Sequence, residues 1–184
     1  MAEGPERKII LIGYRCTGKT TIGKELADRL GLNFIDTDVL AEAKAGMTIQ
    51  EMISKKGWDF FREKEREAIR TLNALGKSVV ATGGGAILDE SNAVFLKKEG
   101  VLIWLVAGEE TILKRMRGDA VTFSQRPPLS SDELSNEIAT TVAMRTPLYR
   151  RLADFTVNTD AAGIAECVHN IEQMLLEQGL VCPL

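Results

Sequence analysis

Cysteine and histidine are scarce in this chain, and their scarcity excludes several kinds of chemistry. The 184 residues hold three cysteines, Cys16, Cys167 and Cys182, with no C-x-x-C spacing between them. This pattern argues against a disulfide framework and against a zinc site, and it fits a reducing cytoplasm. His169 is the single histidine, so a Ser-His-Asp or Cys-His relay has no other residue to use.

The chain also lacks an excess of positive charge and any long apolar run. Its net charge is −3 and its pI is near 5.4, so no global basic field attracts nucleic acid or anionic lipid. No apolar run approaches membrane-spanning length, and residues 1–5 lack the apolar core of a signal peptide. We therefore expect one cytoplasmic domain, residues 1–184, that acts as a monomer without nucleic-acid or membrane partners.

A glycine-rich stretch is the most informative motif that is present. It reads Gly13-Tyr14-Arg15-Cys16-Thr17-Gly18-Lys19-Thr20 and matches G-x-x-x-x-G-K-S/T, a phosphate-binding loop. The apolar run 8–12 precedes it, and the amphipathic segment 20–30 follows it. A phosphate-binding loop requires this order of strand, loop and helix. Gly13 and Gly18 let the backbone turn its N–H groups toward a phosphate. Lys19 is placed to reach the β- and γ-phosphates of ATP or GTP, and the Thr20 hydroxyl to ligate Mg²⁺. We interpret Cys16 as a spacer in this loop.

Short apolar runs alternate with longer helical patterns, which is typical of an α/β fold with a parallel sheet. The predicted strands are 8–12, 33–35, 78–81, 101–106 and 155–157. Capping boxes at 48–51 and 130–133 mark helix starts. Glycines mark helix ends, at Gly31, Gly46, Gly57, Gly76, Gly100 and Gly179. The polar segment from Gly118 to Leu129 has no helical periodicity, and its length predicts a lid or binding loop.

Two carboxylates, Asp36 and Asp38, follow the second predicted strand. Ligands of open α/β sheets bind at the carboxyl ends of strands, so the pair could serve a metal and a substrate hydroxyl. The spacing equally allows a strand end at which Asp38 caps the next helix. The third predicted strand carries no acidic residue at its end, which makes Asp36 the substitute for the metal carboxylate usual in phosphate-loop proteins.

Two further motifs have both a structural and a binding interpretation. Arg62 and Glu65 lie three residues apart on a charged helical stretch, so they share a face of the helix. They are either part of a solvated face, or Glu65 holds Arg62 in place to bind an anion. Thr82-Gly83-Gly84-Gly85 follows the third strand, and three glycines favour backbone contact with a ligand over a plain turn.

The stretch Arg145-Thr146-Pro147-Leu148-Tyr149 is predicted to end the helix after the lid, because Pro147 breaks or kinks a helix. By itself it is a helix end with a favourable cation. Within an acidic protein, five cations are candidates for one anion-lined cleft: Lys19, Arg62, Arg115, Arg126 and Arg145.

Taken together and in this order, the motifs resemble the shikimate kinase family. That family carries a phosphate loop, D-x-D, F-R-x-x-E, a triple glycine, a lid R-P-L and a later R-x-P-x-Y. The matching stretches here are 13–20, 36–38, 61–65, 83–85, 126–129 and 145–149. The match spans almost the whole chain. It departs from the family at Arg15 and Cys16, where small residues are usual, and in a lid a few residues longer, with Pro128 inserted.

The resemblance implies a three-layer α/β/α, nucleoside-monophosphate-kinase-like fold. Its five-stranded parallel sheet would have the order 2-3-1-4-5, with a mobile lid at about 118–129 and a substrate-binding helical region at about 38–75. It implies transfer of the ATP γ-phosphate to the 3-hydroxyl of shikimate with Mg²⁺, a step in making aromatic amino acids.

Motifs and resemblance together assign the site residues. The catalytic set is Lys19, Asp38 and Arg126, the last as the lid arginine on the transferring phosphate. The nucleotide-binding set is Gly13, Arg15, Cys16, Thr17, Gly18, Lys19, Thr20, Thr21 and Arg115, the last along the adenine face. Shikimate is assigned to Asp38, Arg62, Gly83, Gly84, Gly85 and Arg145, and the metal to Thr20 and, through water, Asp36.

The main alternative is another small-molecule kinase of the same fold, such as a gluconate kinase, since gluconate also offers a carboxylate and hydroxyls. A nucleoside-monophosphate kinase would need aromatic or amide contacts to a second base, and no such set stands out. A GTP-binding switch should carry N-K-x-D, and the sequence has no such tetrapeptide. A paralogue that only binds ligand is disfavoured by Lys19, Asp38 and Arg126.

Overall fold

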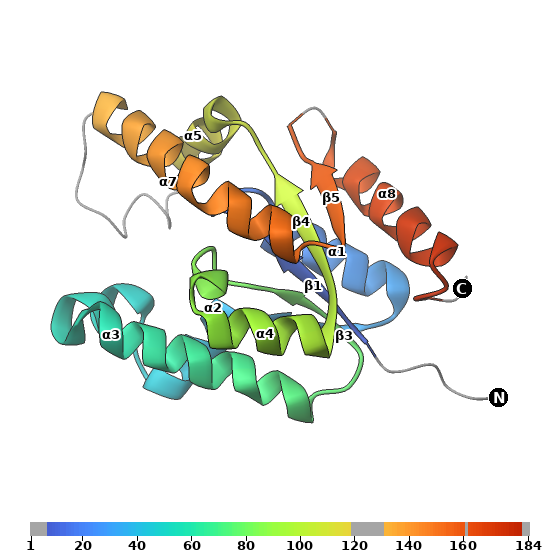
Figure 1. The fold of residues 1–184 in the computed structure, drawn as a ribbon, viewed down its shortest axis with the longest axis horizontal. Helices are drawn as coiled ribbons and strands as arrows, with labels where there is room; N and C mark the ends of the chain where they lie inside the picture. The colour runs from blue at the N-terminus through green and yellow to red at the C-terminus, as the bar shows by residue number, and fades with distance from the viewer. Residues whose placement is uncertain (1–6, 119–130, 161, 182–184) are drawn as a thin grey trace.

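A computed structural model describes residues 7–118, 131–160 and 162–181 of the chain. The described residues form a five-stranded parallel sheet, with the order β2-β3-β1-β4-β5 (Figure 1). Its strands are β1 (Lys8–Ile12), β2 (Asn33–Asp36), β3 (Ser78–Ala81), β4 (Gly100–Val106) and β5 (Phe155–Asn158). The predicted strand order is confirmed, and each predicted strand lies within one residue of its observed bounds.

Seven α-helices and two 3-10 turns connect the strands within the described residues. The helices are α1 (Lys19–Leu30), α2 (Thr37–Ala45), α3 (Ile49–Arg70), α4 (Glu90–Glu99), α5 (Glu109–Gly118), α7 (Ser131–Leu152) and α8 (Ile164–Glu177). The 3-10 turns are η1 (Thr71–Ala74) and η2 (Ala86–Leu88). Among the helices of these described residues, none is both long enough and apolar enough to cross a membrane.

Local capping chemistry sets several helix ends as predicted. Thr48 and Glu51 form a reciprocal capping box at the start of α3, with backbone-to-side-chain bonds of 3.1 and 3.2 Å. Gly31 and Gly46 end α1 and α2 in the left-handed conformation, where a side chain would be strained. Gly57 has a φ of 84° and interrupts α3 rather than ending it. The predicted capping box at 130–133 lies partly outside the described residues.

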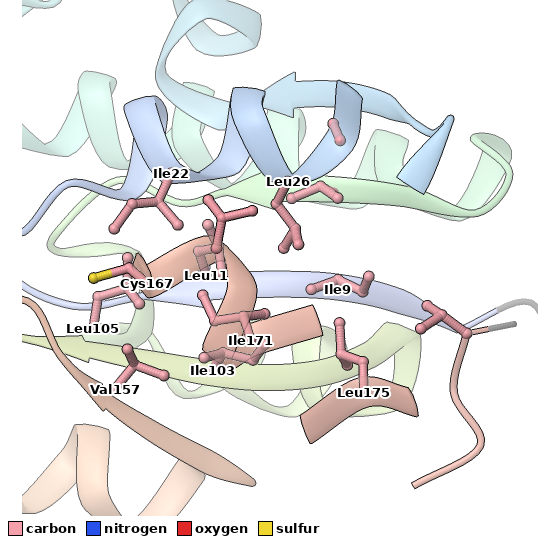
Figure 2. Packing of buried hydrophobic residues seen from close by; sticks show 14 residues of the cluster. Ile9, Leu11, Ile22, Leu26, Ile103, Leu105, Val157, Cys167, Ile171 and Leu175 are labelled. Carbon is pink, nitrogen blue, oxygen red and sulfur yellow. The ribbon is translucent and has the colours of Figure 1, made fainter. Parts of the chain in front are cut away.

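The sheet is buried on both faces because alternate residues of its strands point to opposite sides. Ile9 and Leu11 of β1 pack on one face with residues of α1 and α8, and Figure 2 shows these two helices closing over them. Ile10 and Ile12 pack on the other face, in a cluster that includes residues of α3, α4 and α7. Helices on both faces therefore leave the carboxyl edge of the sheet as the place for a site.

The predicted end of the helix at residues 145–149 is wrong, because α7 continues through Pro147 to Leu152. A proline removes one helical N–H. The packing of the next turn outweighs that loss, since Tyr149 is 2% exposed and stacks on Trp104 with ring centroids 5.7 Å apart. The predicted lid, 118–129, lies outside the described residues except for Gly118, which ends α5.

Candidate active site

The phosphate-binding loop joins β1 to α1 and is closed by its own side chains. Lys19 Nζ and Thr17 Oγ1 both donate to the carbonyl oxygen of Tyr14, at 2.7 and 2.8 Å. Gly13 has a φ of 143°, and a Cβ there would lie 2.5 Å from the carbonyl oxygen of Leu105. This position therefore requires glycine for close approach as well as for conformation.

Lys19 lines a cavity of about 270 Å³ at the carboxyl edge of the sheet. Its side chain is 8% exposed, and this burial lowers the pKa of Lys19 to about 8, while the nearby carboxylates Asp38 and Asp36 act in the opposite direction. The other predicted residues that line this cavity are Arg15, Cys16, Gly18, Thr20, Thr21, Asp36, Asp38 and Gly84.

Asp36 and Asp38 have different environments although they are one residue apart. Asp36, at the end of β2, accepts bonds of 3.0 Å from the backbone N–H of Asp38 and from Thr20 Oγ1. Asp36, not Asp38, therefore caps α2, which corrects the capping alternative considered for Asp38. The Thr20 hydroxyl and the Asp36 carboxylate are hard oxygen donors beside the phosphate loop, so the donor set fits a divalent cation.

Asp38 is half-buried and lines this cavity together with Gly84 of the glycine triplet. Its Oδ1 is buried and has no hydrogen-bond partner among the described residues. Burial, together with the neighbouring carboxylates Asp36 and Glu65, raises the pKa of Asp38 to about 7, against the opposite effect of Lys19. A carboxylate with an unused oxygen and a pKa near neutrality is suited to orient a hydroxyl and accept its proton.

A second cavity, of about 690 Å³, extends from Asp38 along α3. Arg62 lines it and donates from Nη1 to Glu65 Oε2 at 2.6 Å, while its guanidinium lies 5.5 and 5.1 Å from the rings of Trp58 and Phe61. Glu65 is 1% exposed, and burial raises its pKa against the effect of Arg62. The Arg62–Glu65 pair is thus not a solvated helix face.

The glycine triplet lies between the two cavities and allows three elements to meet. A Cβ at Gly83 would lie 2.5 Å from Asp38 Oδ1, and one at Gly85 would lie 2.7 Å from Arg62 Nη2. The Gly84 carbonyl accepts bonds from Arg145 Nη1 at 3.0 Å and from Tyr149 Oη at 2.6 Å. Any side chain at 83 or 85 would therefore displace Asp38 or Arg62.

One of the predicted cations that the structure describes is not in these cavities. Arg115 lines neither and instead donates to the Cys16 carbonyl at 3.2 Å and to the Thr159 carbonyl at 2.6 Å, where it braces the back of the phosphate loop. Arg126 lies outside the described residues. Of the five cations predicted to share one cleft, Lys19 lines the first cavity, and Arg62 and Arg145 line the second.

Several residues that build the site were not assigned from the sequence. Thr37 Oγ1 accepts from the Gly83 N–H at 3.0 Å, and Thr159 Oγ1 donates to the Thr17 carbonyl at 3.2 Å. Thr37 lies within the motif 36–38 and Tyr149 within the motif 145–149, so the sequence pattern did point to both positions. Thr159 stands in no motif, and the fold alone brings it to the loop.

The phosphate loop, the acidic end of β2 and the second cavity define a small-molecule kinase of the nucleoside-monophosphate-kinase-like fold. The family model for shikimate kinase matches residues 15–176. The shikimate kinase of Syntrophus aciditrophicus is 45% identical over 177 residues, which cover 92% of this chain and 91% of that protein. The chain therefore belongs to the shikimate kinase family.

Solved structures agree with this membership. The structure of shikimate kinase from Acinetobacter baumannii in complex with shikimate aligns with a TM-score of 0.86 and 33% identity, covering 96% of both chains. Shikimate kinase from Bacteroides thetaiotaomicron aligns with a TM-score of 0.83 and 30% identity, covering 92% of this chain and 98% of that one. A gluconokinase from Sinorhizobium meliloti 1021 aligns with a TM-score of 0.57 and 19% identity, covering 94% of this chain and 97% of that chain. This is a likeness of fold alone. The comparisons thus favour shikimate kinase over the gluconate kinase alternative.

Proposed function

We propose that this chain transfers the γ-phosphate of ATP to the 3-hydroxyl of shikimate, giving shikimate 3-phosphate and ADP. The observation that carries the proposal is the carboxylate of Asp38, which lines both cavities and has an unused oxygen between them. ATP would occupy the cavity of the phosphate loop, and the acceptor the cavity along α3. The comparison with the Acinetobacter baumannii structure, which holds shikimate, supports the choice of acceptor.

On the donor side, Lys19 and the loop N–H groups would hold the phosphates of ATP. Thr20 and Asp36 are the residues that would hold Mg²⁺, which when bound neutralises charge on the β- and γ-phosphate oxygens. The nucleotide-binding assignment is supported for six residues that line this cavity: Arg15, Cys16, Gly18, Lys19, Thr20 and Thr21. Arg115 would act by bracing the loop from behind, next to the proposed adenine side.

On the acceptor side, Asp38 would orient the 3-hydroxyl and take its proton. The bond from the γ-phosphorus to the β–γ bridging oxygen breaks, a bond from phosphorus to the hydroxyl oxygen forms, and ADP leaves with the bridging oxygen. Arg62, Arg145 and the backbone of Gly84 would hold the shikimate carboxylate. Region 38–75 would supply the apolar wall of this pocket, including Ile53 and Trp58. The lid at 118–129, with Arg126, stays a prediction.

We further propose that the chain acts as a monomer in the cytoplasm, on small molecules and not on nucleic acid or membranes. The net charge of −3 supports the absence of nucleic-acid and membrane partners. The lack of C-x-x-C spacing among the three cysteines supports a reducing compartment. Light scattering on the purified chain tests the monomer directly.

ADP release should depend on shikimate and be weak with gluconate or AMP as acceptor. The reason is that Asp38, Arg62 and Arg145 together demand a hydroxyl and a carboxylate on one rigid frame. A coupled assay with ATP and Mg²⁺ measures this, with each acceptor tested at the same concentration. Comparable turnover on gluconate would contradict the assignment of substrate.

Replacing Arg62 by lysine should raise the KM for shikimate at least about tenfold, because an ammonium cannot bind a carboxylate through two parallel bonds. Glu65→Gln should produce part of the same loss, since Glu65 holds Arg62 at 2.6 Å. Steady-state kinetics with shikimate varied measure both changes.

The matched control for Arg62→Lys is Arg66→Lys. Arg66 lies one turn further along α3 and pairs with Asp89 at 2.9 Å, outside the second cavity. Its substitution should leave the KM for shikimate unchanged. Equal effects of the two substitutions would mean that α3 contributes only general charge.

A further inference from the structure

The two cavities share three residues among those that the structure describes, Arg15, Asp38 and Gly84. A group that passes from the ATP cavity to the acceptor cavity must pass this junction. Asp38 supplies a negative charge there and Gly84 supplies backbone. Arg15 is therefore the residue that brings positive charge to the junction, and it comes from within the phosphate loop itself.

The guanidinium of Arg15 is held from two sides. Its Nη2 donates to Glu137 Oε1 of α7 at 3.1 Å, and its Cζ lies 5.4 Å from the centre of the Tyr14 ring. The side chain is 22% exposed, and its Nε is buried without a partner in the described part of the chain. Arg15 thus has a defined place and still has a donor that no described residue uses.

The approach of the loop to the glycine triplet brings Arg15 close to the path of the phosphoryl group. A Cβ at Gly84 would lie 3.1 Å from the backbone nitrogen of Arg15, so the two segments pack without a side chain between them. The other cations of the described site are already committed elsewhere. Lys19 lies on the donor side, Arg62 is bound to Glu65, and Arg145 is bound to the Gly84 carbonyl.

We propose that Arg15 binds the phosphoryl group on the acceptor side of the junction and holds it on the phosphorylated product. The proposal rests on the function proposed above and adds a phosphate-binding residue to it. Glu137 positions Arg15 while the phosphate is absent. A bound phosphate would accept a hydrogen bond from the unused Nε–H of Arg15. A doubly charged phosphate is a stronger acceptor than the partly exposed carboxylate of Glu137.

Calorimetric titration of the whole chain with shikimate, ADP and shikimate 3-phosphate tests this proposal. In Arg15→Met the affinity for shikimate 3-phosphate should fall at least about tenfold, the scale of a charged hydrogen bond. The affinity for shikimate, which has no phosphate, should stay within about twofold of wild type. The affinity for ADP should do the same, because Arg15 belongs to the nucleotide-binding loop through its backbone N–H, which the substitution keeps. Arg15→Lys keeps the charge and should lose less than Arg15→Met.

The matched control is Arg29→Met, which breaks a surface pair of similar length, Arg29–Glu172 at 3.3 Å, between α1 and α8. It should change none of the three affinities. Unchanged product affinity in Arg15→Met overturns the proposal. So does a parallel loss for all three ligands, which would mean that Arg15 only shapes the loop. Should Arg15→Met fail to fold, Arg15→Lys tests the same selectivity with a smaller loss, because an ammonium keeps the charge but lacks the Nε donor.

Failure of the proposed function gives a different result. The wild-type chain would then bind ADP but neither shikimate nor shikimate 3-phosphate. That outcome overturns the substrate assignment, and the proposal for Arg15 with it. Binding of all three ligands by wild type, with selective loss of the product in Arg15→Met, supports both.

Discussion

Lys19→Met should lower kcat by about 10³-fold or more, because a positive charge directed at the phosphates is lost from a buried position. Lys19 is 8% exposed and lies in the cavity of the phosphate loop. Its ammonium donates to the Tyr14 carbonyl at 2.7 Å, so the side chain has a fixed place at the loop. Initial rates at saturating ATP and shikimate measure the change.

Lys24→Met provides the control for this loss, since Lys24 is an exposed lysine of the same helix, α1. It removes the same charge and should leave kcat unchanged. Circular dichroism should show both variants folded, although Lys19→Met also removes the bond that closes the loop. A folded Lys19→Met variant with wild-type kcat would remove Lys19 from the catalytic set.

The sequence predicts the parts of this site that lie within one short stretch of chain. The phosphate loop could be read directly, because its glycines, Lys19 and Thr20 are contiguous and their chemistry depends on the local backbone. The strand order followed from the resemblance, and the strand bounds from short apolar runs between helical patterns. Arg62 and Glu65 could be paired because residues three apart on a helix share a face.

Contacts between distant segments could not be predicted in the same way. Arg15 meets Glu137 across 122 positions, and Arg115 meets Thr159 across 44. The roles of Asp36 and Asp38 also stayed open, since spacing alone does not say which of two neighbouring carboxylates turns back to cap α2. The continuation of α7 through Pro147 depended on the stacking of Tyr149 on Trp104, a tertiary contact that outweighs the local preference.

The carboxylates around Gly83 show a cost of this arrangement. Asp38 Oδ1 and Glu65 Oε1 are both buried and both lack a partner among the described residues. Both would lie within 3.0 Å of a Cβ at Gly83, which places them on one small surface. Two like charges held together away from water destabilise the fold, and such strain is common where a site must keep a reactive group available.

Asp38→Asn should lower kcat by about 10²–10⁴-fold, the range of a general base, because the amide keeps the shape of Asp38 but cannot accept the proton of the hydroxyl. For the wild type, kcat/KM for shikimate should fall as the pH drops below about 7, where Asp38 becomes protonated. The residual activity of Asp38→Asn should lack this dependence. A pH profile with an unchanged acidic limb in the variant would assign that limb to another group.

The same substitution should make the chain more stable, and more so at pH 8 than at pH 5. The folded-state pKa of Asp38, about 7, lies above its ordinary value of 3.8, so the folded chain holds this proton more tightly than the unfolded chain. Ionisation of Asp38 therefore does not lower the free energy of unfolding below pH 3.8. The loss of stability grows from there until the pH reaches about 7. Removing the charge should raise the free energy of unfolding at pH 8 by about 2–4 kcal/mol.

Urea unfolding at pH 5 and pH 8 measures this difference, with Asp59→Asn as the control. Asp59 is an exposed residue of α3, so its substitution changes the net charge by the same amount without touching the site. Equal stability of Asp38→Asn and wild type at pH 8 would mean that the ionised carboxylate is not strained. A gain in stability together with the loss of turnover would show that the position of Asp38 at the junction of the two cavities is kept for chemistry, at the expense of the fold.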